Sequence, residues 1–268
     1  MKSLYLPQWK AFIRYYDISA EGNVVVYLPA LSFPAIANFL PVATHPKMPR
    51  HRALLIDNLG SGFSDHAGSF NYTMEEHAKT VAAILDHENL KAATVVGHSM
   101  GGTIAILLAL SRPDLVAKLV VGEGNITPGG GAGTRRIAAY SKEEYVGDVF
   151  PRTRAGLIES AVAGDEMATR LSGLWATVYP DGLYGNAKSL VELDPLLKKR
   201  FLNLTIPRTF IYGENSLPGG SVEVSPDAPD PGELKAHGVE IGVVPKAGHS
   251  QMFENLDGFV DVLIKALT

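Results

Sequence analysis

Six short apolar segments alternate with longer segments whose apolar residues recur at helical spacing, and this alternation constrains the fold most. The short segments are VVVYL (24–28), ALLID (53–57), AATVVG (92–97), AKLVVGE (117–123), RTFIY (208–212) and VEIGVVP (239–245). Strands that are apolar throughout have to be covered on both faces, which is typical of parallel sheets with crossover helices. The sequence therefore predicts an α/β fold with a mostly parallel sheet and helices on both faces.

One long segment interrupts this alternation. It begins near TPGGGAG, a run of chain breakers, and continues with several helix-like stretches, among them TRAGLIESAVAG and DEMATRLSGLWATVY. We interpret residues 126–199 as a helical cap inserted between the strands 117–123 and 208–212. Residues 1–125 and 200–268 would then form the core domain.

Composition and charge exclude several classes of function. The chain has 268 residues, a net charge of -4 and no long basic run, so neither nucleic acid nor an anionic membrane is an expected partner. It has no cysteine, and no His/Glu cluster has metal-ligand spacing, so no metal site is predicted. The N-terminus lacks an apolar core for a signal peptide and no apolar run reaches 18 residues, so a cytoplasmic protein is expected. Nothing indicates an oligomeric state.

Ser99 lies in Gly97-x-Ser99-x-Gly101, within VVGHSMGG. The pentapeptide follows an apolar strand and opens an apolar helix, as a nucleophile elbow requires. Small residues at 97 and 101 avoid clashes in such a strained turn, and the N–H of Met100 would lie at a helix N-terminus. The alternative is a tight Gly/Ser turn without chemistry.

Four blocks in order along the chain resemble the α/β-hydrolase fold. They are VVVYLPALSF, LLIDNLGSGFSD, YTMEEHAKTVAAILDHENLKAATVVGHSMGG and VVPKAGHSQMFENLDGF. The resemblance implies an eight-stranded, mostly parallel sheet and a cofactor-free triad in the order nucleophile, acid, histidine. It also implies two backbone oxyanion donors, which here correspond to the N–H groups of Leu31 and Met100. Pro29 and Ala30 replace the usual His-Gly before that first donor.

His249 lies in KAGHS, just after the last strong strand, and is the expected general base. His98 is adjacent to Ser99, but its side chain has to leave the elbow in another direction, so we expect it to support the loop. His77 and His87 fall in the helix after Thr73 and are expected to be solvated.

The acid of the expected triad is not where the resemblance places it. That position, three residues after the Gly that ends RTFIYG, is Ser216, which cannot carry a negative charge. Glu123 ends the strand that follows the elbow helix, and we predict that it is the acid instead. Asp227 or another carboxylate of the loop after Ser216 remains the alternative, as does an idle surface role for Glu123.

The predicted function is a serine hydrolase that cleaves a carboxylic ester or lactone of a small apolar substrate through an acyl-enzyme. Phe33, Trp175 and Tyr179 are candidates for the substrate pocket, although each is equally compatible with the core. The alternatives are carbon–carbon bond hydrolysis of a diketone-like substrate and a non-catalytic ligand-binding protein on the same fold. Haloalkane dehalogenation is disfavoured because it requires an aspartate at position 99.

Overall fold

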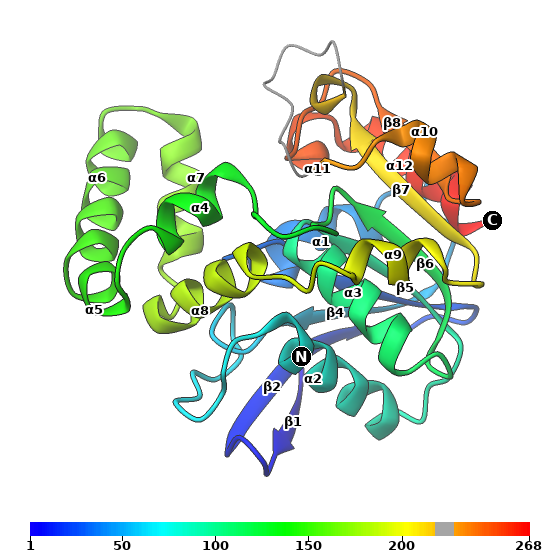
Figure 1. Cartoon of the computed structure of the whole chain (residues 1–268), viewed down its shortest axis with the longest axis horizontal. Coiled ribbons are helices and arrows are strands. Elements are labelled where there is room, and N and C mark those ends of the chain that lie inside the picture. The colour runs from blue at the N-terminus through cyan, green and yellow to red at the C-terminus, as the bar shows by residue number, and fades with distance from the viewer. Residues whose placement is uncertain (218–227) are drawn as a thin grey trace.

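The computed structural model describes residues 1–217 and 228–268, and one sheet lies at its centre (Figure 1). Within these residues eight strands pair in the order β1-β2-β4-β3-β5-β6-β7-β8. Their bounds are β1 (Lys2–Leu6), β2 (Ala11–Ile18), β3 (Val24–Leu28), β4 (Arg52–Asp57), β5 (Ala93–His98), β6 (Val116–Gly122), β7 (Arg208–Gly213) and β8 (Glu240–Val244). The pairs β1–β2 and β2–β4 are antiparallel and the others are parallel. The predicted mostly parallel sheet is confirmed.

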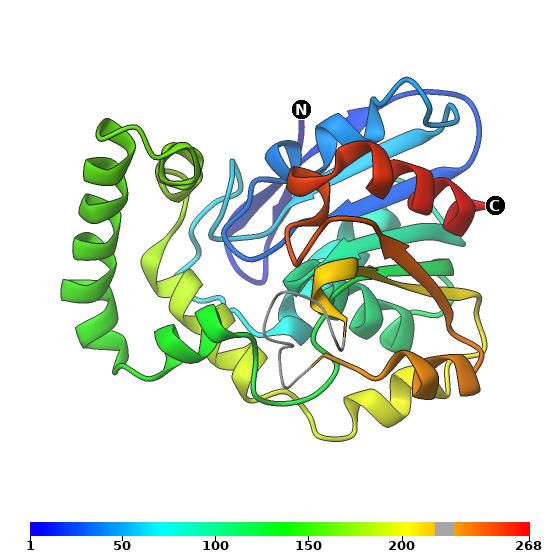
Figure 2. The same cartoon turned by 90° about the horizontal axis from the view of Figure 1, so that it is seen from above.

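Helices cover both faces of the sheet (Figure 2). Alternate residues of each strand enter opposite layers: on β3, Val26 and Leu28 pack in one core cluster, and Val25 and Tyr27 in the other. The first layer contains α2 (Met74–His87), α3 (Met100–Ser111), α9 (Leu197–Leu202) and α10 (Pro231–Ala236). The second contains α1 (Ala35–Ala43), α11 (Gln251–Glu254) and α12 (Leu256–Leu267). The continuous apolar strands are thus buried on both sides.

The helix α2 begins after Thr73, which caps it: the Thr73 hydroxyl accepts the N–H of Glu76 at 3.2 Å. The expectation that His77 is solvated is wrong, whereas His87 is exposed as expected. His77 is fully buried, and its Nε2 lies 2.8 Å from Oδ1 of Asn186. Asn186 belongs to a helix far along the chain that covers this part of α2, so the periodicity of α2 alone did not indicate the contact.

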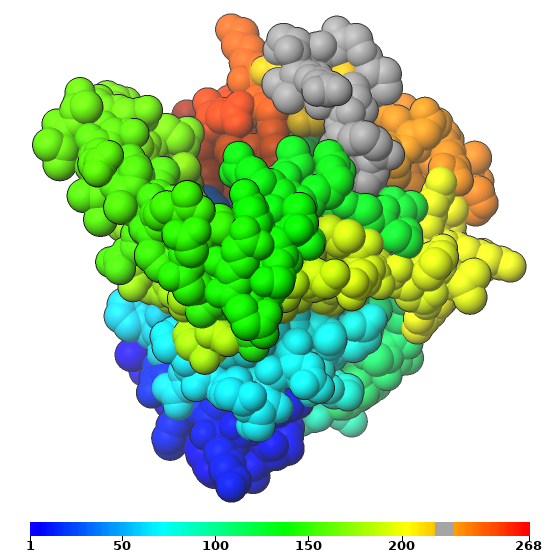
Figure 3. Space-filling view, turned by 60° about the vertical axis from the view of Figure 1, so that its left-hand side comes forward, coloured from blue at the N-terminus to red at the C-terminus, as the bar shows by residue number. Residues whose placement is uncertain are grey.

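The chain between β6 and β7 is helical, as the sequence predicts. It contains α4 (Ala132–Ala138), α5 (Lys142–Glu144), the π-helical turn η1 (Tyr145–Val149), α6 (Phe150–Val162), α7 (Glu166–Trp175), α8 (Pro180–Val191) and α9. A small cluster separate from the two sheet layers includes Tyr145, Phe150 and Leu183. Helices α6 and α7 pack together as a hairpin, whose tip projects from the body as a green lobe in Figure 3.

The carboxyl ends of four parallel strands meet at one edge of the sheet. His98 pairs with Gly122 across β5 and β6, Gly122 with Ile211 across β6 and β7, and Gly213 with Val244 across β7 and β8. The loops that follow these strands therefore lie side by side. Among the described residues, no helix is long and apolar enough to cross a membrane.

Candidate active site

Ser99 occupies a strained turn between β5 and α3. Its backbone angles, φ 52° and ψ -121°, are costly for a residue with a side chain. The turn closes because both glycines lack a side chain: a Cβ at Gly97 would lie 2.2 Å from the carbonyl oxygen of Gly101, and one at Gly101 would lie 2.1 Å from that of Leu28. The N–H of Ser99 donates to the Gly122 carbonyl at 2.8 Å, which ties the turn to β6. The sequence motif thus forms an elbow in the structure.

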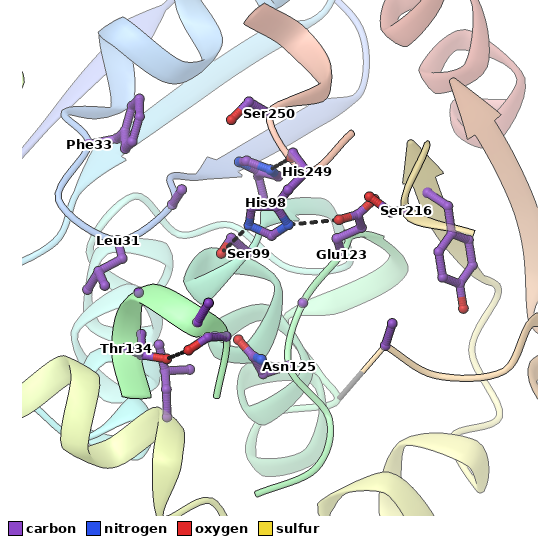
Figure 4. A pocket seen from close by; sticks show the side chains of 18 of the residues that line it. Leu31, Phe33, His98, Ser99, Glu123, Asn125, Thr134, Ser216, His249 and Ser250 are labelled. Atoms are coloured by element: carbon purple, nitrogen blue, oxygen red, sulfur yellow. Dashed lines mark hydrogen bonds and ion pairs between the residues drawn. The ribbon is translucent and has the colours of Figure 1, made fainter. Parts of the chain in front are cut away.

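Three side chains from three separate loops form a continuous hydrogen-bonded line (Figure 4). Nε2 of His249 lies 3.0 Å from Oγ of Ser99, and Nδ1 of His249 lies 2.7 Å from Oε2 of Glu123. An ionised carboxylate can only accept, so Nδ1 carries the proton and Nε2 is left to accept from the serine hydroxyl. The Glu123 side chain is 11% exposed and that of His249 55%, so the acid is shielded while the histidine remains accessible.

Glu123 reaches this line from the end of β6 with a left-handed backbone, φ 45°. Its Oε1 accepts the N–H of Gly213 at 2.7 Å and Nε2 of Gln251 at 3.2 Å. Burial acts to raise the pKa of the Glu123 carboxyl, whereas the hydrogen bond and the charge of His249 act to lower it. With the donors Gly213 and Ser216 added, the pKa of Glu123 lies below its ordinary value and the group is ionised at neutral pH.

Ser216, at the position vacated by the expected acid, belongs to the short 3₁₀ turn η2 (Glu214–Ser216). Its hydroxyl donates a hydrogen bond to the Glu123 carboxylate. The serine found where an acid is expected thus supports the glutamate that takes the place of that acid. Other nearby carboxylates are engaged elsewhere: Glu214 accepts the N–H of Lys246 at 2.8 Å, and Asp230 caps α10. The alternative acid Asp227 lies outside the described residues.

His98 supports the loop that carries His249, as expected. Its ring is buried, and its Nε2 donates to the His249 carbonyl oxygen at 2.8 Å. Burial lowers the pKa of His98 to about 4, so the ring is neutral at physiological pH. A neutral donor in this place holds the His249 backbone without adding a competing charge beside the imidazole.

The two predicted oxyanion donors come from separate segments of the chain. Leu31 lines the pocket beside Ser99, and Met100 is the first residue of α3. Within the described residues, neither N–H is paired with another protein group. The loop of Leu31 is held by buried Asn38, whose Oδ1 accepts the N–H of Ala30 at 2.8 Å. Asn38 lies in a helix with no motif, so the sequence did not indicate this support.

A cavity of about 530 Å³ opens onto Ser99. Its apolar wall contains Leu31, Phe33, Leu190, Phe210, Tyr212 and Phe253. Phe33, a predicted pocket residue, lines this cavity. The predictions for Trp175 and Tyr179 are wrong, because neither is among the described residues that line the cavity. Trp175 stacks on Phe150 at 5.2 Å between ring centroids, and Tyr179 stacks on His66 at 4.8 Å, because α7 and α8 turn these faces toward their own packing contacts. In the described part of the chain, no group of His, Asp or Glu side chains could hold a metal ion.

Known proteins resemble parts of this chain in sequence. The family model described as alpha/beta hydrolase fold matches residues 28–160, just under half of the chain. A Bacillus subtilis protein named uncharacterized hydrolase YugF is 45% identical over 60 residues, 22% of each chain. The mouse sn-1-specific diacylglycerol lipase ABHD11 is 38% identical over 125 residues, which are 46% of this chain and 39% of the lipase. These matches thus span less than half the length of either relative.

Solved structures match over nearly the whole length. An enol-lactonase from Burkholderia xenovorans LB400 superposes with a TM-score of 0.76 at 16% identity, covering 98% of this chain and 99% of that one. A hydrolase from Pseudomonas aeruginosa PA01 superposes with a TM-score of 0.73 at 21% identity, covering 99% and 97%. The family model and these structures support the α/β-hydrolase superfamily, and the chain has the α/β-hydrolase fold.

Proposed function

We propose that this chain is a serine hydrolase that cleaves a carboxylic ester or lactone of a small apolar substrate. The observation that carries the proposal is the hydrogen-bonded line from Ser99 through His249 to the buried carboxylate of Glu123. A serine hydroxyl, a neutral imidazole with a free acceptor nitrogen and an ionised acid are the parts that acyl transfer requires.

The reaction begins when Nε2 of His249 takes the proton of the Ser99 hydroxyl as Oγ attacks the substrate carbonyl. The developing oxyanion accepts the N–H groups of Leu31 and Met100, one of which lies at the positive end of α3. The imidazolium that forms is stabilised by Glu123 and then protonates the leaving alkoxide, which leaves an acyl-enzyme. Water activated by His249 hydrolyses that ester and restores the serine.

The pocket supports a small, mainly apolar substrate. Its volume of about 530 Å³ and its wall of aromatic and aliphatic side chains suit a ligand with few polar groups. Residues 126–199, the predicted cap, join the core of 1–125 and 200–268 through α9, whose Leu197 already packs in the first layer. Thr134 of α4 and Leu190 of α8 reach the pocket from this segment. The cap therefore contributes to substrate choice, while the core supplies the reacting groups.

Dehalogenation is a competing reaction that the relatives suggest. Haloalkane dehalogenase 2 of Mycobacterium tuberculosis is 32% identical over 93 residues, 35% of this chain and 32% of that protein. Displacement of a halide by an enzyme nucleophile needs a carboxylate whose ester water can reopen. Ser99 lacks that carboxylate, so we retain acyl transfer.

A fluorophosphonate probe tests the proposal directly, because it labels a serine only when a base activates it. We expect stoichiometric labelling of Ser99, none in Ser99→Ala, and turnover of 4-nitrophenyl butyrate that disappears in the same variant. A folded wild-type protein that neither reacts with the probe nor hydrolyses aryl esters or lactones would be a binding protein on a hydrolase fold.

A further inference from the structure

The two oxygens of the Glu123 carboxylate have different partners. Oε2 faces Nδ1 of His249, whereas Oε1 accepts from the Gly213 backbone and from the side-chain amide of Gln251. The terminal torsion of a glutamate is broad, so nothing intrinsic to Glu123 keeps Oε2 directed at the histidine. Its orientation depends on the other donors to the carboxylate, which are Gly213 and Gln251 at Oε1 and the Ser216 hydroxyl.

The side chain of Gln251 lies in the core, where it makes this contact with Glu123. It is the first residue of α11, two residues after His249, and its side chain is fully buried. Its Nε2 donates to Oε1 of Glu123 at 3.2 Å and to the carbonyl oxygen of Ile211 at 3.1 Å. Both neighbours are acceptors, so the amide nitrogen has to face them, and the reverse orientation would oppose oxygen to oxygen.

The oxygen of the same amide shows that this orientation leaves one polar atom of Gln251 without a hydrogen bond in the described part of the chain. Oε1 of Gln251 is buried and accepts no hydrogen bond from the described residues. It lies against Gly122, where a Cβ would be 3.3 Å away. An unpaired buried carbonyl is unfavourable, and a shorter apolar residue would avoid it. The two donated bonds therefore serve the groups that receive them, Glu123 and the end of β7.

We infer that Gln251 is a positioning residue for the proposed serine hydrolase reaction, because it holds the Glu123 carboxylate in the orientation that directs Oε2 at His249. The inference rests on the proposed function. One segment of chain, 249–251, thus carries both the base and the group that aligns its acid.

The test compares steady-state hydrolysis of 4-nitrophenyl butyrate by the full chain and its variants. Gln251→Met keeps the side-chain length but donates no hydrogen bond, and we expect kcat to fall about tenfold while KM changes less than twofold. In a Glu123→Ala background the same substitution should change kcat less than twofold, because the carboxylate through which it acts is absent. An equal loss in both backgrounds would overturn the inference.

Gln251→Glu adds a signature in pH that a packing defect would not produce. When protonated, the new carboxyl can donate to Glu123, and when ionised it repels it. The ratio of variant to wild-type kcat should therefore be highest at acidic pH and fall as pH rises. A ratio that stays constant with pH overturns the inference, and this variant decides the matter if Gln251→Met does not fold.

A control separates these effects from any loss of a buried hydrogen bond. Thr80→Val removes the bond from the Thr80 hydroxyl to the His77 carbonyl in α2, remote from the site, and should leave kcat unchanged. Probe labelling of wild-type Ser99 distinguishes a failure of the proposed function from a failure of the inference about Gln251. Absence of labelling overturns the proposed function and the inference with it, whereas normal labelling with undiminished kcat in Gln251→Met overturns the inference alone.

Discussion

Two helices of similar length, α3 and α6, have opposite surroundings. Ten of the twelve residues of α3 are buried, and it lies directly beneath the elbow that carries Ser99. Of the thirteen residues of α6, only Phe150 is buried, and the helix lies on the projecting hairpin. Packing on every side leaves no freedom for the backbone that aims Ser99, whereas the hairpin is restrained mainly along one face.

The core and the helical segment between β6 and β7 also differ in what they contribute to the pocket. The core supplies Ser99, His249 and Glu123 from segments that follow neighbouring strands, so small shifts there alter both hydrogen-bond distances. The helical segment contributes wall residues from α4 and α8, while α6 contributes none among the described lining residues. Substitutions in the core should therefore change chemistry or folding, and substitutions in the hairpin should change neither strongly.

The largest expected effect is on chemistry in the core. Glu123→Gln should lower kcat about 10³- to 10⁴-fold, because an amide cannot stabilise the imidazolium and favours the wrong tautomer. Hydrolysis of 4-nitrophenyl butyrate measures this, with circular dichroism to verify the fold. Activity within tenfold of wild type would remove Glu123 from the triad and direct attention to the loop after Ser216.

The difference in stability between wild type and Glu123→Gln should also depend on pH. Because the folded pKa of Glu123 lies below its ordinary value of 4.5, its ionised form adds stability above that pH, and the addition is lost as pH falls through the lowered value. The difference in Tm between wild type and Glu123→Gln should thus be present at pH 7 and shrink on acidification.

The next effect is on core stability. Gly101→Ala should reduce the free energy of unfolding by about 3 kcal/mol, since its Cβ would lie 2.1 Å from the backbone oxygen of Leu28 and neither strand nor helix can yield. Urea denaturation measures the change. A loss below about 0.5 kcal/mol would show that the elbow is less tightly packed than its geometry implies.

Substitution of a glycine in the hairpin should change the free energy of unfolding in the opposite direction. A Cβ at Gly156, within α6, meets no atom within 4 Å. Gly156→Ala should therefore raise the free energy of unfolding by about 0.5–1 kcal/mol through helix propensity, with kcat unchanged. The pair Gly101→Ala and Gly156→Ala, measured together by urea denaturation, tests the contrast between the two helices in one experiment. Destabilisation by both would contradict it.

The smallest expected effect concerns a contact between the two regions. The Arg170 guanidinium of α7 lies 4.9 Å from the ring centroid of Phe253, which lines the pocket and packs against Phe33. Arg170→Ala should lower stability by about 0.5 kcal/mol, as expected for an exposed cation–π contact, and should alter KM more than kcat. Arg170→Lys serves as the control that keeps the charge. A kcat loss above tenfold would place α7 within the catalytic machinery.

Local patterns in the sequence predicted much of this molecule. The apolar strands, the helix after Thr73 and the elbow around Ser99 each depend on neighbouring residues, so they could be recognised from short stretches. His249 could be selected because it follows the last strong strand. Glu123 could be proposed only through the absence of an acid at Ser216, combined with the expected adjacency of the strands that precede the two positions.

Contacts between distant segments could not be predicted in the same way. Asn38 and Gln251 carry no motif, and their roles depend on which backbone or carboxylate oxygen lies opposite them. The helix periodicity predicts that His77 is solvated, and this fails because the partner of its buried ring, Asn186, lies more than a hundred residues later. Residue type alone favours Trp175 and Tyr179 as pocket residues, but the packing of α7 and α8 directs them elsewhere.

The sequence by itself determined the α/β architecture, the strained serine turn and the histidine loop, because strand burial and glycine geometry act over a few residues. Only the tertiary structure decided which carboxylate meets His249, which side chains hold it and which aromatic residues line the pocket. The reason is physical: a hydrogen bond depends on distances of tenths of an ångström between groups that the chain brings together only after its helices and strands have packed.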